Sequence, residues 1–138
     1  MPVVMFELPD TEAVRAGRRE LTTRACVLFA EVLEAPVERI RAYVRRYDLE
    51  DAAAGGVWMA DGGPDGPFYQ FFVLGDRPAS HVQALHRGFT DLLVDVLGYA
   101  PGSIRGVCSR INPADWGIAG VTADIARKSE QAARAGQN

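Results

Sequence analysis

The second residue of the chain is a proline, and its nitrogen is the first candidate for chemistry. If Met1 is removed, as commonly happens before a small second residue, the chain begins with the secondary amine of Pro2. Desolvation lowers the pKa of such an amine because it disfavours the charged form. The neutral amine accepts a proton as a general base and returns it once protonated. A Met-Pro start is a weak signal by itself, since a single residue is not a motif.

Arg77 is the second candidate. It stands in the segment Gly75-Asp76-Arg77-Pro78-Ala79-Ser80, between an apolar stretch and a helical pattern. A guanidinium beside a helix N-terminus forms an anion site, because it adds its donors to the free backbone N–H groups. The alternative is a surface ion pair of Arg77 with Asp76 or Asp10.

Common catalytic motifs do not occur: the chain has no Gly-x-Ser-x-Gly, no P-loop, no Gly-x-Gly-x-x-Gly after a strand and no His-Glu-x-x-His. The pairs Gly55-Gly56 and Gly62-Gly63 lack the lysine and hydroxyl residue of a phosphate-binding loop and fit a flexible loop. His81 and His86 do not have the i, i+4 spacing of metal ligands on one helix face. We expect His81 to be solvated, and we expect no metal and no cofactor.

The composition excludes several classes of partner. The 138 residues, 48% hydrophobic and 24% charged, suffice for one compact domain or two very small halves. The net charge of -3 gives no broad attraction to nucleic acid or anionic lipid. Cys26 and Cys108 cannot build a disulfide framework or a four-ligand zinc site. Since no apolar run approaches about 20 residues and no signal-peptide pattern occurs, we expect a soluble, cytoplasmic protein.

Hydrophobic periodicity predicts the elements that must position the candidate groups. Residues 3–8 form a short apolar run typical of a strand. Helical spacing of apolar residues predicts a helix over about 11–33, and alternation predicts a half-buried strand over 39–47. Pro36 ends the helix, because a proline disfavours helical geometry in the residue before it.

The second half repeats this order after a glycine- and proline-rich loop over 48–67. Strand, helix and strand are predicted over 68–74, 80–97 and 104–111. Val57-Trp58-Met59 is an apolar island in the loop that could form a short edge strand. Ser80 and Gln83 match a capping box at the start of the second helix. The tail from residue 123 is expected to form a short helix.

The two halves also repeat in sequence: Ala35-Pro36 precedes Ile40-Arg41, and Ala100-Pro101 precedes Ile104-Arg105. Each half is therefore a βαβ unit with a right-handed crossover. Two such units can share one four-stranded sheet with both helices on one face, which is an α/β fold of the α+β sandwich kind. We expect a single domain over residues 1–138 with four parts: a first unit over about 2–47, a loop over 48–67, a second unit over about 68–111 and a C-terminal segment over 112–138.

With these features the chain resembles the tautomerase superfamily, and within it the type of malonate semialdehyde decarboxylase and cis-3-chloroacrylic acid dehalogenase. In that type two βαβ units are fused in one chain and the N-terminal proline is catalytic. The resemblance covers roughly residues 2–120. The matching segments are Met1-Pro2, Ala35-Pro36-Val37-Glu38-Arg39, Arg77-Pro78-Ala79-Ser80 and Asn112-Pro113-Ala114-Asp115-Trp116-Gly117.

The resemblance implies roles for individual residues. Pro2 matches the catalytic proline, and Arg77 matches an arginine that binds the substrate carboxylate. Glu38 lies, with a one-residue gap, near the position of an aspartate that orients the proline or activates water. Trp116 matches an apolar wall of the pocket, and the alternative is a core anchor at the end of the sheet.

Two departures from the family pattern leave alternatives open. Ala79 stands where decarboxylase-like members have a second arginine, and Arg110 or Arg45 could replace that arginine from other strand positions. No residue of the first helix matches the histidine of dehalogenase-type members. Tyr43 or Phe6 could extend the apolar wall, which keeps the pKa of the amine low by excluding water.

The expected function is keto–enol tautomerisation of a small 2-oxo carboxylic acid, with Pro2 as general base and acid. Decarboxylation of a 3-oxo acid is the second expectation, and hydration or dehalogenation of an unsaturated acid is the third. A non-catalytic oligomeric α/β protein is the alternative from another class. The resemblance implies a homotrimer, and the only other partner expected is a small carboxylate substrate.

Overall fold

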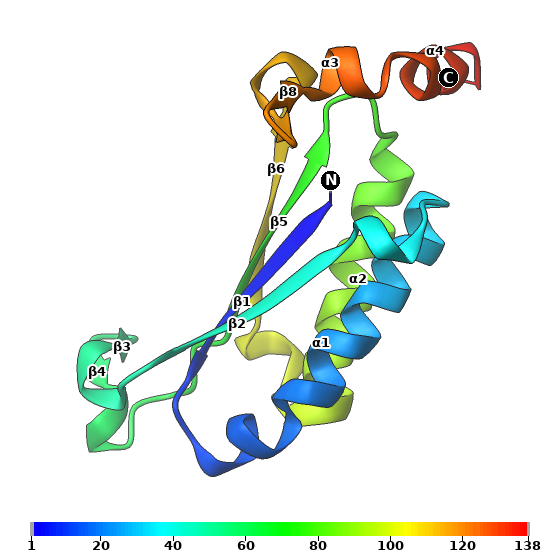
Figure 1. The fold of residues 1–138 in the computed structure, drawn as a ribbon. Coiled ribbons are helices and arrows are strands. Elements are labelled where there is room, and N and C mark those ends of the chain that lie inside the picture. The colour runs from blue at the N-terminus through cyan, green and yellow to red at the C-terminus, as the bar shows by residue number, and fades with distance from the viewer. Residues whose placement is uncertain (1, 138) are drawn as a thin grey trace.

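The computed structural model describes residues 2–137, without the side chains of residues 129–131 and 137. Its centre is a four-stranded sheet in the order β2-β1-β5-β6, with two helices on one face (Figure 1). The outer pairs β1·β2 and β5·β6 are parallel, and the central pair β1·β5 is antiparallel. This confirms the expected fold class. The elements are β1 (Val3–Pro9), α1 (Glu12–Leu33), β2 (Arg41–Tyr47), β5 (Phe68–Leu74), α2 (Ala79–Leu97) and β6 (Arg105–Ile111).

The strand directions bring distant parts of the chain to one end of the sheet. Val3 of β1 pairs with Arg41 of β2 and with Phe72 of β5, so β1 and β2 begin where β5 ends. Each connecting helix runs back along the sheet, because the strands it joins are parallel. The end of α1 and the start of α2 therefore lie at this same end of the sheet (Figure 1).

The core lies between the sheet and the two helices. Four phenylalanines at its centre, one each from β1, α1, β5 and α2, have no exposed surface. Their rings meet edge to face, with centroids 5.3 to 6.0 Å apart, an arrangement that aromatic pairs prefer. They are Phe6, Phe29, Phe71 and Phe89. Phe6 is thus a core residue packed on Phe89, and not the pocket wall that the sequence left open.

The two long helices begin in different ways. The side chain of Thr11 accepts a hydrogen bond from Val14 N–H at 3.3 Å and caps α1. The capping box expected at Ser80 is wrong, because the N-cap of α2 is Pro78, two residues earlier, and it makes no side-chain hydrogen bond. Pro78 already has the extended backbone that this position requires, so Ser80 lies inside the first turn.

His86 on α2 belongs to the core side of the helix. Its Nδ1 lies 2.7 Å from the hydroxyl of Tyr69, and its ring lies 5.0 Å from the Phe71 ring. Burial lowers the pKa of His86 below the usual 6.5, because the core disfavours the charged imidazole. The folded state therefore binds a proton less readily than the unfolded chain.

This histidine makes the fold sensitive to mild acid. We expect the contribution of neutral His86 to the free energy of unfolding to be complete above the usual pKa of 6.5. As the pH falls below that value and through the lower pKa of the folded state, the unfolded chain binds more protons than the folded one, so this contribution is lost. Urea unfolding of His86→Gln between pH 8 and 5 should show a shallower loss of stability than the wild type. Equal pH dependence of the two proteins contradicts this prediction.

The second face of the sheet carries no helix (Figure 1). Tyr43 of β2 is 50% exposed there, and Phe68 and Val107 are also exposed. Trp116 leans on this face against Phe72, with ring centroids 6.1 Å apart. The apolar island of the loop forms β4 (Val57–Trp58), which pairs with β3 (Ala53–Ala54) in a separate hairpin and not with the main sheet.

The C-terminal segment returns to the end of the sheet where β1 begins (Figure 1). After the hairpin of β7 (Gly117–Ile118) and β8 (Val121–Thr122), it forms α3 (Ala123–Ala126) and α4 (Lys128–Gln137). The tail, for which one short helix was expected, thus contains two helices. None of the helices within residues 2–137 is long and apolar enough to cross a membrane.

Candidate active site

A cavity with a narrow inner part and a broad outer part opens at this end of the sheet. The inner part has a volume of about 30 Å³ and the outer part about 550 Å³. The two parts adjoin, because five residues line both of them: Leu33, Ala35, Arg39, Arg77 and Arg134.

Pro2 lines the inner part of the cavity and is buried. Its carbonyl accepts a hydrogen bond from Arg41 N–H at 3.1 Å, which continues the β1·β2 ladder and fixes the position of the residue. The apolar side chains around it are Leu33, Val73 and Leu74. A free amine at this position would have its pKa lowered by burial and by neighbouring cations. The expected removal of Met1 concerns a residue outside the described part of the chain.

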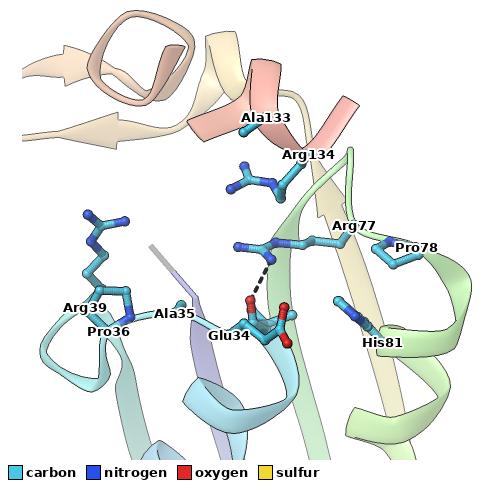
Figure 2. A pocket seen from close by; sticks show the side chains of 10 residues that line it. Glu34, Ala35, Pro36, Arg39, Arg77, Pro78, His81, Ala133 and Arg134 are labelled. Carbon is cyan, nitrogen blue, oxygen red and sulfur yellow. Dashed lines mark hydrogen bonds between the residues drawn. The ribbon is translucent and has the colours of Figure 1, made fainter. Parts of the chain in front are cut away.

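Arg77 reaches the cavity from the turn between β5 and α2. Its Nη1 donates a hydrogen bond to the carbonyl of Leu33 at 2.8 Å (Figure 2). Leu33 ends α1, so this carbonyl is one of those that the helix itself cannot pair. Of the two alternative partners, Asp10 binds Arg15 at 2.7 Å and Asp76 binds Arg134 at 2.5 Å. Arg77 therefore joins the end of α1 to the start of α2 with its guanidinium on the cavity.

Three further arginines line the inner part of the cavity, and no site role was expected for them from the sequence: Arg39, Arg127 and Arg134. Figure 2 shows the guanidinium groups of Arg39, Arg77 and Arg134 around the outer part, each from a different segment of the chain. Arg134 comes from α4, and its Nε donates to the Asp76 carboxylate at 2.5 Å. Nothing in the local pattern of the tail indicates that it folds back over Pro2.

The charge of the cavity favours an anionic ligand. Among the residues that line it, only Glu34 carries a carboxylate, and it belongs to the outer part. Clustered cations in a partly enclosed site raise the local concentration of anions. No group of histidine, cysteine and carboxylate side chains that could hold a metal ion occurs among the residues that the structure describes.

His81 differs from the expectation of a solvated residue. It lies in the first turn of α2, lines the outer part of the cavity and is only partly exposed. Its Nδ1 is buried and has no hydrogen-bond partner in the described part of the chain. His81 reaches the cavity because it lies in the first turn of α2, next to Pro78, which also lines the outer part.

The structure does not bring the other four candidate residues into this cavity. Glu38 is exposed on the short turn before β2, where its neighbour Arg39 faces the cavity instead. Tyr43 lies on the helix-free face of the sheet, half exposed. Trp116 lies on that face too, with its indole N–H buried and without a hydrogen-bond partner among residues 2–137.

Arg110 acts on the same turn that presents Arg77. Its Nη1 donates to the carbonyls of Gly75 at 3.3 Å and of Arg77 at 2.5 Å. It thus supports the backbone of the turn rather than lining the cavity. Arg45, the other arginine considered, lies 3.9 Å from Glu7 in an exposed ion pair.

The sheet order, the tandem βαβ units and the one-sided helices form a fold that this chain shares with solved structures of fused 4-OT proteins. Native fused 4-OT shares it with a TM-score of 0.82 and 24% identity, over 89% of this chain and 97% of that one. A fused 4-OT wild type described as an asymmetric trimer has a TM-score of 0.80 and 21% identity, over 90% and 98%. A protein inactivated by 2-oxo-3-pentynoate has a TM-score of 0.80 and 14% identity, over 89% and 98%.

Comparisons of the sequence with family models and with curated proteins give no match. The narrower resemblance to malonate semialdehyde decarboxylase and cis-3-chloroacrylic acid dehalogenase stays a prediction.

Proposed function

We propose that this protein is an enzyme that interconverts the keto and enol forms of a small 2-oxo carboxylic acid, with the free amine of Pro2 as general base and acid. The observation that carries the proposal is the position of Pro2 at the inner end of a cavity whose lining includes four arginines. A buried amine supplies the base, and the guanidinium groups supply the charge that a carboxylate requires.

The proposed reaction moves one proton. The neutral Pro2 amine takes a proton from the carbon beside the keto group, and the electrons of that C–H bond move to the carbonyl oxygen as an enolate. Arg77 and Arg39 hold the substrate carboxylate and stabilise the enolate oxygen, which gains charge in the transition state. The protonated amine then gives its proton to that oxygen, which forms the enol.

Decarboxylation of a 3-oxo acid is the second candidate, and the position of Arg39 favours it. Ala79 had left the site one arginine short, and Arg39 lines the same cavity as Arg77. Two arginines can hold a carboxylate while a protonated Pro2 polarises the neighbouring carbonyl. Nothing comparable favours hydration or dehalogenation.

The experiment combines mass spectrometry of the intact protein with an assay of phenylenolpyruvate tautomerisation and of 3-oxo acid decarboxylation. The proposal requires a chain that begins at Pro2 and at least one of these activities. 2-Oxo-3-pentynoate carries an alkyne conjugated to a ketone, which amines attack. It inactivates one protein of this fold and should here modify the Pro2 nitrogen and abolish activity. A retained Met1, or inactivation through another residue, overturns the proposal.

We further propose that three copies assemble through the helix-free face of the sheet. Exposed apolar side chains on this face, Tyr43, Phe68 and Val107, would be covered in an assembly. Fused 4-OT proteins of the same fold are described as trimers. Light scattering should give the mass of a trimer at micromolar concentration, and a monomer contradicts this prediction.

A further inference from the structure

The C-terminal helix α4 is fastened to the cavity by an ion pair. Arg134 of α4 binds Asp76 through Nε at 2.5 Å. The side chains of the pair are 17% and 24% exposed, whereas the surface pair Arg15 and Asp10 is 59% and 32% exposed. Because water screens the pair less than a surface pair, it holds α4 more firmly than a surface contact does.

The ion pair uses only one side of the guanidinium. Asp76 engages Nε, and no hydrogen bond engages the two terminal amino groups of Arg134 in the part of the chain that the structure describes. Figure 2 shows this guanidinium above that of Arg77, on the cavity. The terminal groups of Arg134 are therefore available to a ligand while Asp76 fixes the direction of the side chain.

The partner of Arg134 belongs to the turn that presents Arg77. Asp76 precedes Arg77 in the chain, and Arg110 donates hydrogen bonds to the carbonyls of Gly75 and Arg77 in the same turn. The turn thus fixes both cations relative to each other: Arg77 directly, and Arg134 through Asp76. Neighbouring cations repel, so an anion between them is favoured.

We propose that the C-terminal helix supplies a substrate-binding residue, Arg134, to the Pro2 cavity, and that Asp76 is the positioning residue that directs it. This inference rests on the proposed function, since it assigns a further contact to the carboxylate of the same substrate. The ligand class is a small carboxylic acid that enters through the outer part of the cavity, which Arg134 lines together with Arg77.

The experiment compares Arg134→Ala with Arg15→Ala, which removes an arginine from another Asp–Arg pair, far from the cavity. Loss of a hydrogen bond to a charged group weakens binding by about tenfold or more. We expect Arg134→Ala to raise both KM for phenylenolpyruvate and the dissociation constant of phenylpyruvate about tenfold, with kcat nearly unchanged. The methyl ester of phenylpyruvate should bind both proteins equally, and Arg15→Ala should behave as the wild type.

Two further variants distinguish a direct contact of Arg134 with the ligand from a purely structural role of this residue. Arg134→Lys keeps the charge and should recover part of the lost affinity for the acid. Asp76→Asn keeps the size of the side chain but releases Arg134, so KM should rise by a smaller factor. Equal weakening of acid and ester in Arg134→Ala, or no weakening of either, overturns the inference. If Arg134→Ala does not fold, the same comparison of acid and ester in Arg134→Lys decides.

The outcomes also distinguish this inference from the proposed reaction. A wild type that turns over no 2-oxo or 3-oxo acid but binds phenylpyruvate through Arg134 contradicts the proposed function and supports the inference. Turnover that requires Pro2 but is indifferent to Arg134 supports the function and contradicts the inference.

Discussion

Insertion of one glycine between Met1 and Pro2 should lower kcat for phenylenolpyruvate by about a hundredfold to ten-thousandfold. The insertion turns the Pro2 nitrogen into an amide, which has no basic lone pair, and leaves every side chain of the cavity in the sequence. General acid–base catalysis contributes about 10²- to 10⁴-fold to enzyme rates, so loss of the base should cost this range. Initial rates under substrate saturation, with the N-terminus confirmed by mass spectrometry, measure the effect.

The matched control is the same insertion after Gly55, in the exposed hairpin loop far from Pro2. This variant should keep the activity of the wild type. Pro2→Ala should lose less than the glycine insertion, since it retains an amine at the same position. If the chain with glycine before Pro2 keeps its rate within a few fold, the amine is not the base and the proposed mechanism fails.

Replacement of Arg77 by alanine should lower kcat/KM for phenylenolpyruvate by about tenfold to a hundredfold. A hydrogen bond to a charged group contributes about 1.5–3 kcal/mol, and about 1.4 kcal/mol corresponds to a factor of ten. Arg77→Lys should lie between alanine and wild type, because lysine keeps the charge but not the planar pair of donors. Steady-state kinetics with the three proteins measure the effect.

Arg77 also has a structural contact, the hydrogen bond to the Leu33 carbonyl, and the controls separate the two roles. Arg87→Ala removes an exposed arginine of α2 that does not line the cavity, so it changes net charge alone. A structural role weakens the binding of phenylpyruvate and of its methyl ester equally, whereas carboxylate binding affects only the acid. Unchanged kcat/KM in Arg77→Ala would exclude this arginine from the site.

Local patterns in the sequence were sufficient to predict the main strands and helices. The strands at 3–8, 39–47, 68–74 and 104–111 and the two long helices were predicted within about two residues, because burial on one face imposes its period on the sequence. The βαβ repeat then indicated that the two strands of each unit are parallel, since strands joined by a helix crossover point the same way. The antiparallel pairing of β1 with β5, which no repeat within one unit predicts, brings Pro2 and the turn with Arg77 to one end of the sheet.

The lining of the cavity depended on details that local patterns do not contain. Glu38 and Arg39 are neighbours in one short turn, and its geometry alone directs Arg39 to the cavity and leaves Glu38 exposed. Trp116 and Tyr43 face the side of the sheet away from the helices, which a motif cannot reveal. The start of α2 at Ala79 also followed from Pro78 and not from the capping box.

Pro2, Arg77 and the order of the elements could be read from the chain alone, because side-chain type and periodicity are properties of neighbouring residues. The contribution of the C-terminal tail to the cavity, Arg134, could not be read from the chain alone. Arg134 reaches Asp76 across 58 residues of sequence, and only the folding of α4 over the end of the sheet brings the two together. Such contacts depend on the packing of whole elements, so the four arginines around Pro2 are a property of the tertiary structure.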